Sequence, residues 1–472
     1  METARPIKPS PEASPKDRAA WIARQMPAGG LFADHHWRLA VSPFPIERNL
    51  ARALDSLGRI LLKFYQAVER LHRLSAEGKQ PGWIAELLDH GKPQSLLQWQ
   101  QAPGLRNATP RVIRPDLLLT ESGFSITEID SVPGGIGLTA WLNHTYAGLT
   151  RSEDGVIGGE RGMMHGFAGI FGKAPRVHII VSEESANYRP EMEWLAAKLG
   201  PERFLVQGPD FTDVASGDAA YRFFELFDLA NVPAAASLFD RAGVGDILCT
   251  PPPKPVFEEK LLFGLLWNRN LEGFWHRELG EGFFKRLQQA VPFTWIVDPS
   301  PLPPHAVYPR LNLTEWQQLK SLSQRQRELI LKISGFSEAA WGSRGVYLGS
   351  DLSQTDWSAA VDRAIASWPD SPFILQEYHK PALVEADWFD ASSGRVQTMR
   401  GRVRLCPYYF VHGEGQAART HLGGVLATIC PPDKKIIHGM TEAILAPCRV
   451  SSASPVIPKT AGVPVGLEPR GA

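Results

Sequence analysis

The hydrophobic pattern of the first hundred residues is helical. Between about residues 46 and 98, apolar side chains recur at steps of three and four, which places them on one face of an α-helix. The pattern predicts one long helix through most of 47–74, with an apolar face formed by Leu50, Leu54, Leu57, Ile60, Leu61, Phe64, Val68 and Leu71. Such a helix can pack against a core or form part of a substrate lid, and the pattern assigns it no chemistry.

Residues 175–210 have the pattern of a parallel α/β unit. The run 176–182 is almost continuously apolar, as in a strand that is buried on both faces. Residues 191–199 have helical spacing, Gly200 with Pro201 ends the helix, and 204–207 form the next strand. This order predicts a parallel sheet. Because the unit lacks a G-x-G-x-x-G motif, we do not expect it to bind a dinucleotide.

The C-terminal half predicts a second module of helices and strands. Helices are expected around 257–289, and a glycine-containing loop is expected at 335–349. A helix follows this loop, with Thr355 as the expected N-cap. The expected strands are 293–297, 329–333, 373–378, 403–411 and 423–429.

The segment 114–130 has the pattern of two strands joined by a tight turn, which predicts a β-hairpin. The two strands meet at Glu121-Ser122-Gly123, and Gly123 can take the positive φ that a three-residue loop requires. In that register Thr120 faces Phe124. A two-residue turn at Ser122-Gly123 is the alternative, and it shifts every cross-strand pair.

The choice of turn decides which polar groups meet. The three-residue loop places Asp116 opposite Glu128. It also places Arg114 opposite Asp130, so three carboxylates share a face with Leu118, Phe124 and Ile126. Like charges paired on a half-apolar face are unfavourable, and Mg²⁺, which prefers carboxylate oxygens, would relieve that cost. The two-residue turn places Asp116 opposite Ile129 and leaves an ordinary surface hairpin.

Composition narrows the class of protein. The 472 residues, 43% of them hydrophobic, fit two or three domains or one large enzyme with several lobes. The 50 acidic and 50 basic residues give no net charge, which argues against a general nucleic-acid binder or a polybasic membrane anchor. The four cysteines form no C-x-x-C pair, so we expect buried thiols. Neither a signal peptide nor a membrane helix is predicted, so we expect a soluble cytoplasmic protein.

A second candidate site begins at Lys332, inside the apolar strand 329–333. A lysine in this position is costly unless its ammonium meets an anion. The loop that follows would bring backbone amides and a guanidinium to the same anion, through Gly342, Ser343, Arg344 and Gly345. Together these groups suit a polyphosphate, although the order is not that of a Walker A loop. The alternative is an edge lysine that extends into solvent.

Three other segments indicate a binding site only when their order along the chain is considered together with the groups above. Gln376-Glu377-Tyr378 ends a strand, where a backbone turn can present amides and carbonyls to a purine; taken alone, it is an ordinary strand end. Lys260, near a helix start, is by itself a solvated charge. Arg402 and Arg404 share one face of a strand, where they bind a carboxylate or phosphate or face solvent.

This order of acidic hairpin, strand lysine, glycine loop and hinge resembles the circularly permuted branch of the ATP-grasp superfamily. The chain looks most like the synthetase domain of glutathionylspermidine synthase and its uncharacterised bacterial relatives. Their pattern of Arg-x-Asp and then Glu-x-Asn is matched here by Arg114-Pro-Asp116 and Glu128-Ile-Asp130. The resemblance covers about 110–449. Asp130 stands where the family has Asn, so it is either a full metal ligand or the partner of Arg114. The family's amidase domain is absent, and its glutathione-binding residues find no match.

The resemblance implies that Asp116, Glu128 and Asp130 hold Mg²⁺. It implies that ATP is bound by Lys260, Lys332, Gly342, Ser343, Arg344, Gly345, Gln376, Glu377 and Tyr378. The expected catalytic residues are Arg114, Lys332 and Arg404.

The activity implied by the resemblance is an ATP-dependent carboxylate–amine ligase that works through an acyl phosphate. Its partners would be small-molecule or peptide carboxylates and amines, with no nucleic acid and no membrane. One alternative is a Mg-ATP-dependent kinase of a small molecule. Another is a catalytically silent ATP-binding regulator, which ranks lower because all three carboxylates are retained.

The expected fold class is α/β with α+β lobes, as a circularly permuted ATP-grasp fold. The expected divisions are a disordered 1–17, a mainly helical 18–110, a metal-binding hairpin and loop at 111–150, an α/β domain resembling the pre-ATP-grasp domain at 151–256, a nucleotide-binding module at 257–449, and a disordered tail at 450–472.

Overall fold

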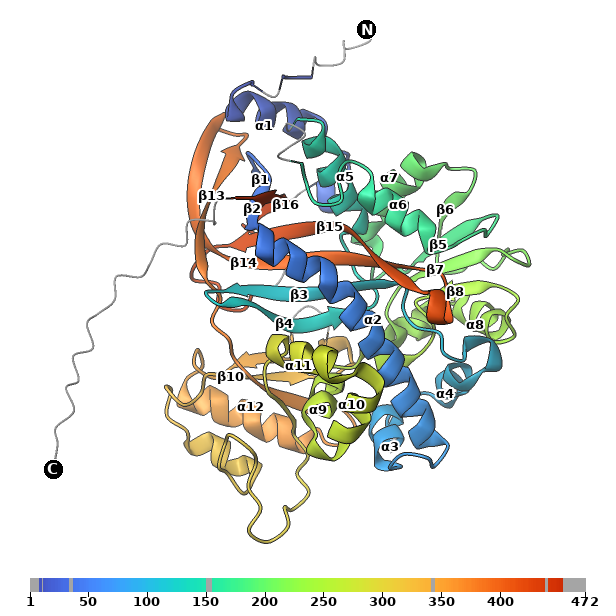
Figure 1. Ribbon diagram of the computed structural model, residues 1–472, viewed down its shortest axis with the longest axis vertical. Coiled ribbons are helices and arrows are strands. Elements are labelled where there is room, and N and C mark those ends of the chain that lie inside the picture. The colour runs from blue at the N-terminus through green and yellow to red at the C-terminus, as the bar shows by residue number, and fades with distance from the viewer. Residues whose placement is uncertain are drawn as a thin grey trace, which may run out of the picture.

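The computed structural model describes residues 8–10, 12–33, 37–149, 155–340, 344–437 and 440–452. It has a mixed α/β architecture with three β-sheets (Figure 1). Within these ranges no helix has the length and apolar character needed to cross a membrane. All four cysteines are buried and unpaired, as expected.

The long helix predicted at 47–74 is confirmed as α2 (Arg48–Ala76). Its apolar face belongs to the main core, together with residues of the large sheet. The preceding and following elements are α1 (Pro15–Arg24), β1 (Arg38–Ala40), β2 (Phe44–Glu47), α3 (Trp83–Asp89) and α4 (Gln94–Gln101). Helix α1 begins inside the segment 1–17 that was expected to be disordered.

The largest sheet has eight strands in the order β13-β1-β16-β15-β14-β3-β4, with β2 beside β16. Strand β13 also pairs with β14, so five strands form a closed ring of pairings. The strands not yet given are β3 (Val112–Thr120), β4 (Gly123–Asp130), β13 (Leu383–Asp390), β14 (Arg395–His412), β15 (Arg419–Cys430) and β16 (Ile444–Ser451). Helix α2 packs on one face, and a second core on this sheet includes residues of α5 (Ile136–Ala147) and α6 (Gly162–Gly169).

The second sheet is parallel, in the order β6-β5-β7-β8. The strand–helix–strand unit predicted at 175–210 is confirmed, since β5 and β6 pair in parallel. The elements are β5 (Val177–Val181), α7 (Arg189–Leu199), β6 (Phe204–Gln207), β7 (Ala219–Phe223), α8 (Ala235–Gly243) and β8 (Leu248–Thr250).

The third sheet is antiparallel, in the order β11-β10-β12-β9. It contains the strands predicted near 293–297, 329–333 and 373–378, which are confirmed. Its strands and associated helices are α9 (Leu261–Trp267), α10 (Glu272–Leu279), α11 (Glu281–Ala290), β9 (Thr294–Ile296), β10 (Leu329–Ile333), β11 (Val346–Leu348), α12 (Gln354–Ala366) and β12 (Phe373–Glu377).

The predicted N-cap of α12 is wrong by two residues. Ser353, not Thr355, caps the helix, because its hydroxyl accepts a hydrogen bond from the Asp356 amide at 3.1 Å. Short 3₁₀ helices link the larger elements at Gly30–Phe32, Pro103–Leu105, Ala186–Tyr188, Leu226–Asn231, Pro255–Glu258, Arg269–Leu271, Trp316–Ser321, Glu338–Ala340 and Gly415–Ala417.

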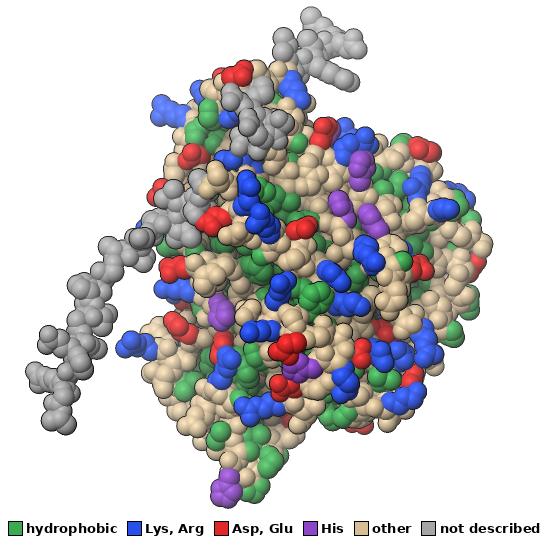
Figure 2. Space-filling view, in the orientation of Figure 1, with side chains coloured by type: hydrophobic (Ala, Val, Ile, Leu, Met, Phe, Trp, Pro, Cys, Tyr) green, Lys and Arg blue, Asp and Glu red, His purple; other side chains and the backbone are tan. Residues whose placement is uncertain are grey.

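The three sheets lie around the centre of the molecule. In Figure 1 the third sheet lies below the large sheet and the parallel sheet lies to the right. On the face shown in Figure 2, basic and acidic side chains are interspersed. The permuted ATP-grasp arrangement and the expected division into domains stay predictions.

Candidate active site

The β3–β4 hairpin brings the acidic residues together in the expected pairs. Asp116 lies opposite Glu128, and Arg114 lies opposite Asp130. The expected three-residue loop is nevertheless wrong, because Thr120 pairs with Gly123 rather than with Phe124. The turn is therefore one residue shorter than predicted, and it is not the alternative turn at Ser122-Gly123 either.

A β-bulge at Thr127 explains how the short turn and the expected pairs coexist. Leu117 pairs with Ile126 and Asp116 with Glu128, so Thr127 has no partner on β3. The additional residue shifts the strand by one position, which restores the carboxylate pairs. It also reverses the face of the preceding residues: Ile126 belongs to the main core, and Phe124 packs against it. The prediction that these two share the carboxylates' face is wrong.

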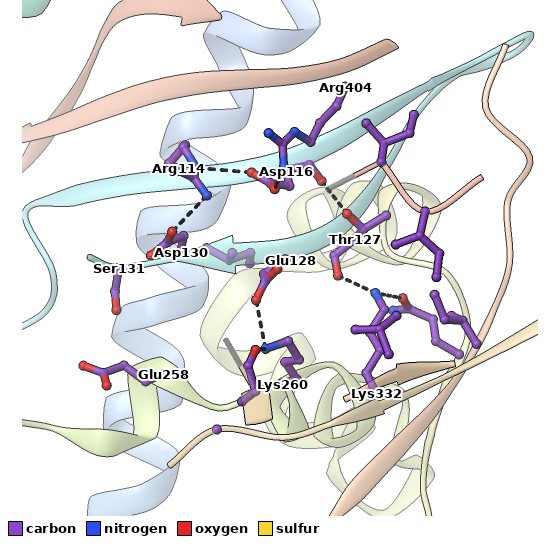
Figure 3. A pocket seen from close by; sticks show the side chains of 18 of the residues that line it. Arg114, Asp116, Thr127, Glu128, Asp130, Ser131, Glu258, Lys260, Lys332 and Arg404 are labelled. Atoms are coloured by element: carbon purple, nitrogen blue, oxygen red, sulfur yellow. Dashed lines mark hydrogen bonds and ion pairs between the residues drawn. The ribbon is translucent and has the colours of Figure 1, made fainter. Parts of the chain in front are cut away.

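A cavity of about 310 Å³ lies where the hairpin meets the third sheet and the loop after β7. The large sheet contributes eight residues of the hairpin and Arg404 of β14, and the third sheet contributes Lys332 and the end of β12. Figure 3 shows these side chains converging. Of the residues predicted from the sequence, the cavity wall contains Arg114, Asp116, Glu128, Asp130, Lys260, Lys332, Gln376, Glu377, Tyr378 and Arg404.

Asp116 is held by two guanidinium groups. Arg114 Nε lies 3.2 Å from its Oδ1, and Arg404 Nη1 donates to its Oδ2 at 3.0 Å. The Cys406 thiol donates to Oδ1 at 3.4 Å. Burial acts to lower the pKa of Arg404, but Asp116 and Cys406 together act in the other direction, and the pKa lies above its ordinary value. Asp116 is therefore a buried carboxylate that is flanked by two guanidinium groups.

Asp130 is paired with Arg114, with 2.9 Å between Oδ2 and Nη2. Burial raises the pKa of Asp130 to about 6, and Glu128 acts in the same direction while Arg114 opposes it. Arg114 also donates to the Gly134 carbonyl at 3.1 Å. The sequence left two roles open for Asp130, a full metal ligand or the partner of Arg114. In the structure Asp130 is paired with Arg114.

Glu128 and Lys260 form the next ion pair, with Oε1 and Nζ 2.9 Å apart (Figure 3). Burial acts to raise the pKa of Glu128, but Lys260 outweighs it and the pKa is lowered. Burial acts to lower the pKa of Lys260, but Glu128 outweighs it and the pKa is raised. Lys260 also donates to the Ala340 carbonyl at 3.4 Å, so it is not the solvated charge that it resembled in isolation.

Lys332 is buried in the middle of the third sheet, since β10 lies between β11 and β12. The alternative of an edge lysine is therefore wrong. Its Nζ donates to the Thr127 carbonyl and to Gln376 Oε1, both at 2.9 Å. Burial lowers the pKa of Lys332 to about 8, although Glu128 acts to raise it. The ammonium spans the gap between the two sheets at the cavity wall.

At the expected purine hinge, Gln376-Glu377-Tyr378, two backbone amides already have hydrogen-bond acceptors within the protein. The amides of Glu377 and Tyr378 donate to the carbonyls of Phe293 and Glu328, each at 3.0 Å. The Glu377 carboxylate pairs with Arg310, with both oxygens 3.1 Å from Nη1. Gln376 uses its amide group on Lys332 and on Thr294. A purine edge at this position would have to meet groups other than these two amides.

The glycine loop is only partly placed at the cavity. Gly345 is buried, and its carbonyl accepts from the Ile333 amide at 3.0 Å. Arg344 pairs with Glu338 at 3.1 Å, and it does not belong to the cavity wall. The predicted positions Gly342 and Ser343 lie outside the described residues.

The sequence reasoning missed two glutamates of the cavity. Glu258 accepts from Arg222 Nη2 at 2.6 Å and from the Leu226 amide at 2.9 Å. Burial, followed by Glu258, raises the pKa of Glu225 well above its ordinary value. The signal for Glu258 was its position two residues before Lys260, whereas nothing in the local pattern distinguishes Glu225 from a surface residue.

The three predicted metal ligands do not form a closed cage. Among the residues that the structure describes, no group of three or more His, Cys, Asp or Glu side chains could hold a metal ion. In nucleotide sites, however, Mg²⁺ is bound by one or two carboxylates together with phosphates. The directly opposed carboxylates of Asp116 and Glu128 are the donor types that such an ion requires.

A scan against models of protein families finds no match, and a search of curated proteins finds none either. Among solved structures, the chain is similar to a glutathione synthetase-like effector from Globodera pallida in its apo form. The sequences are 11% identical, 93% of this chain and 95% of that chain are covered, and the TM-score is 0.50. A protein from Methylobacillus flagellatus KT, provisionally assigned as a gamma-glutamylcysteine synthetase, has 14% identity, coverage of 85% and 89%, and a TM-score of 0.38. The first similarity shows a shared fold.

Proposed function

We propose that this protein is an ATP-dependent ligase that joins a carboxylate to an amine through an acyl phosphate. The observation that carries the proposal is the cavity, in which lysines from one side and arginines with carboxylates from the other meet. Lys332 and Lys260 provide cations, and Asp116 and Glu128 provide opposed carboxylates. The glutathione synthetase-like name of the structural neighbour supports the same class of reaction.

In the first step, a carboxylate oxygen of the acid substrate attacks the γ-phosphorus of ATP. The bond from that phosphorus to the β–γ bridging oxygen breaks, ADP leaves with the electron pair, and an acyl phosphate forms. Lys332 and Lys260 would offset the negative charge on the phosphoryl oxygens, and Arg114 would orient the carboxylate.

In the second step, the amine nitrogen attacks the acyl carbon. The bond from carbon to the phosphate oxygen breaks, phosphate leaves with the electron pair, and the nitrogen loses a proton to give the amide. Water in the cavity would hydrolyse the acyl phosphate, so closure by the glycine-containing loop 335–349 would protect it.

Magnesium, held by Asp116 and Glu128 when bound, would neutralise charge on the ATP phosphates. In the described structure these carboxylates are neutralised by Arg114, Arg404 and Lys260. Mg-ATP would bring both a dication and a polyanion, so Lys260 and Lys332 would pair with the phosphates while Asp116 and Glu128 would hold the metal. The ion pairs within the cavity explain why it can hold so many charges before any ligand is bound.

The test begins with calorimetric titration of ATP in the presence of Mg²⁺. We expect saturable binding to the native protein and at least a tenfold weaker affinity for Lys332→Ala, because one charge-assisted contact is lost. Lys434→Ala is the matched control, since this exposed lysine donates to the Thr441 carbonyl outside the cavity. Absence of ATP binding to the native protein would contradict the proposal.

Product analysis then identifies the reaction. Pairs of carboxylates and amines are screened for release of phosphate, and the products are examined by mass spectrometry. An amide together with ADP and phosphate supports the ligase. A phosphorylated acceptor without an amide supports the kinase, and ATP binding without any turnover across the screen supports the silent regulator.

A further inference from the structure

A second cavity of about 610 Å³ has strand β9 in its wall. Its wall is formed by α3, the end of α9, β9 and the segment after β9. It shares no lining residue with the first cavity. In Figure 1, α3 and α9 lie in the lower part of the molecule. A volume of this size is typical of small-molecule sites.

The wall of this second cavity is unusually aromatic. Five of the 14 tryptophans in the chain line it, and Phe293 and Tyr308 add two further rings. Trp295 and Trp316 are buried, whereas Trp83 on α3 is 37% exposed. Buried rings therefore form the floor and Trp83 lies at the rim, which gives the cavity an opening to solvent.

The floor rings are held in place by their own hydrogen bonds. Trp295 Nε1 donates to the Pro309 carbonyl at 3.0 Å, and Trp316 Nε1 donates to the Asp298 carbonyl at 2.7 Å. Tyr308 stacks on Trp316 with 3.9 Å between ring centroids. Because these indole N–H groups already have acceptors, the rings offer a ligand their π-faces rather than hydrogen bonds. Little ordering of the protein would be needed on binding.

The charged groups of the wall favour a cation. Glu86 and Asp298 line the cavity, and within the described ranges neither forms an ion pair with a basic side chain, while the Asp298 carboxylate accepts from the Ser300 amide at 2.8 Å. Arg269 is the opposing charge in the wall, and His90 pairs with Asp370 at 2.9 Å. Apart from His90, two acidic residues against one arginine give the lining residues an excess of one negative charge.

One cation of the protein, which is also paired with Glu377, already lies against two of these rings. The Arg310 guanidinium lies 4.3 Å from the centroid of Phe293 and 5.4 Å from that of Trp267. Both rings belong to the cavity wall, and Arg310 does not. The ring quadrupole attracts positive charge, so a ligand cation on the remaining rings would gain the same attraction.

We propose that this second cavity binds a small organic cation that carries an aromatic ring, at a site separate from the candidate active site. The aromatic floor would stack on the ring, and the excess negative charge would balance the cationic nitrogen. This inference does not depend on the proposed ligase activity, because no residue is shared between the two cavities.

The probe is benzyltrimethylammonium, with benzyl alcohol as the neutral control and benzoate as the anionic control. We expect saturable binding of the cation by calorimetry, accompanied by quenching of tryptophan fluorescence. The neutral compound should bind at least tenfold more weakly, and benzoate should not bind. Equal binding of the cation and the alcohol, or no saturable binding of the cation, would overturn the proposal.

Two exposed residues of α3 locate the site without disturbing the core. Trp83→Ala and Glu86→Gln should each weaken binding of the cation at least threefold, whereas Glu121→Gln at the hairpin turn should leave it unchanged. Unchanged binding in both α3 variants would place the cation elsewhere and reject the site. Mg-ATP should not displace the cation, and competitive displacement would assign the cation to the first cavity and reject the proposal.

Discussion

Lys332 combines three properties that rarely occur together: burial, a hydrogen-bonded ammonium and a position at a cavity wall. Its two hydrogen-bond partners are both neutral, a backbone carbonyl and the Gln376 amide oxygen. Neutral partners compensate a buried charge less well than a carboxylate does. A phosphate oxygen would therefore be a better partner than either group that Lys332 has now.

Binding of ATP should depend on the charge of Lys332. Burial lowers the pKa of this lysine to about 8, so the ammonium predominates below pH 8 and the neutral amine above it. If only the charged form binds, the affinity should fall about tenfold for each pH unit above that pKa. Calorimetric titrations from pH 7 to 9.5 measure this slope. Lys332→Arg keeps its charge and should give a flatter profile; parallel profiles would show that another group controls the affinity.

Substitution of Asp116 should destabilise the fold. Asp116→Asn removes the negative charge that faces Arg114 and the buried Arg404. Breaking a buried ion pair from one side costs about 3–5 kcal/mol. Chemical denaturation followed by circular dichroism measures this loss. Asp130→Asn is the matched control, because Asp130 faces one guanidinium and its side chain is 23% exposed; an equal loss in both variants would contradict the argument.

At the scale of elements, a β-bulge positions the hairpin, and hydrogen bonds to Glu259 position the start of the glycine loop. The bulge at Thr127 sets the face of Glu128 and turns a carbonyl toward Lys332. The glycine loop begins at Gly335, whose amide donates to Glu259 Oε2 at 3.0 Å. Glu259 also accepts from the Ser334 hydroxyl. The start of the loop is therefore fixed by a residue adjacent to Lys260.

The Lys92–Glu259 pair should hold this start of the loop in place. The Nζ–Oε1 distance is 2.7 Å, and the two side chains are only 4% and 2% exposed. Glu259→Gln leaves the lysine charged and buried, so we expect a loss of about 3 kcal/mol. The double variant Lys92→Met with Glu259→Gln should lose less than the sum of the single losses.

Thermal denaturation of the two single variants and the double variant measures this coupling. Glu77→Gln, which removes one partner of an exposed ion pair with Lys79, is the surface control and should leave the melting temperature unchanged. Additive losses in the double variant would mean that the two side chains do not stabilise each other. ATP affinity should also fall in Glu259→Gln, because the loop loses its anchor.

At the scale of the whole molecule, the candidate active site belongs to no single sheet. The large sheet supplies the carboxylates and arginines, the third sheet supplies Lys332, and the segment after β7 supplies Glu225. A ligand that contacts all three would connect them, so its binding should stabilise the molecule as a whole rather than one part.

Mg-ATP should raise the melting temperature of the native protein. A ligand present at one hundred times its dissociation constant stabilises the folded state by about 2.7 kcal/mol. Differential scanning fluorimetry with increasing Mg-ATP measures the shift, and Lys332→Ala at the same concentrations should show a smaller one. Hydrogen exchange should slow in β4 and in β10 together. Protection confined to one of these strands would argue against a ligand that spans the two sheets.

Regular periodicity explains which elements the sequence predicted. The apolar face of α2 extends over several helical repeats, and the run around β5 is almost continuously apolar, so local pattern alone identifies both elements. The hairpin shows the limit of such inference. Its turn was predicted one residue too long, and the carboxylate pairs are nevertheless correct because of the bulge at Thr127. Nothing in the local pattern distinguishes a bulged strand with a short turn from a regular strand with a longer one.

The sequence by itself determined the residue types of the candidate site and the strands that carry them. The acidic hairpin, the lysine in an apolar strand and the strand end at Gln376 were all visible as local patterns. Only the tertiary structure decided how their charges are balanced. Arg404 and Asp116 are 288 positions apart in the chain, and Lys332 and Thr127 are 205 apart. Partnerships over such separations depend on how the sheets pack, and a charge attracts whichever opposite group the fold brings near it.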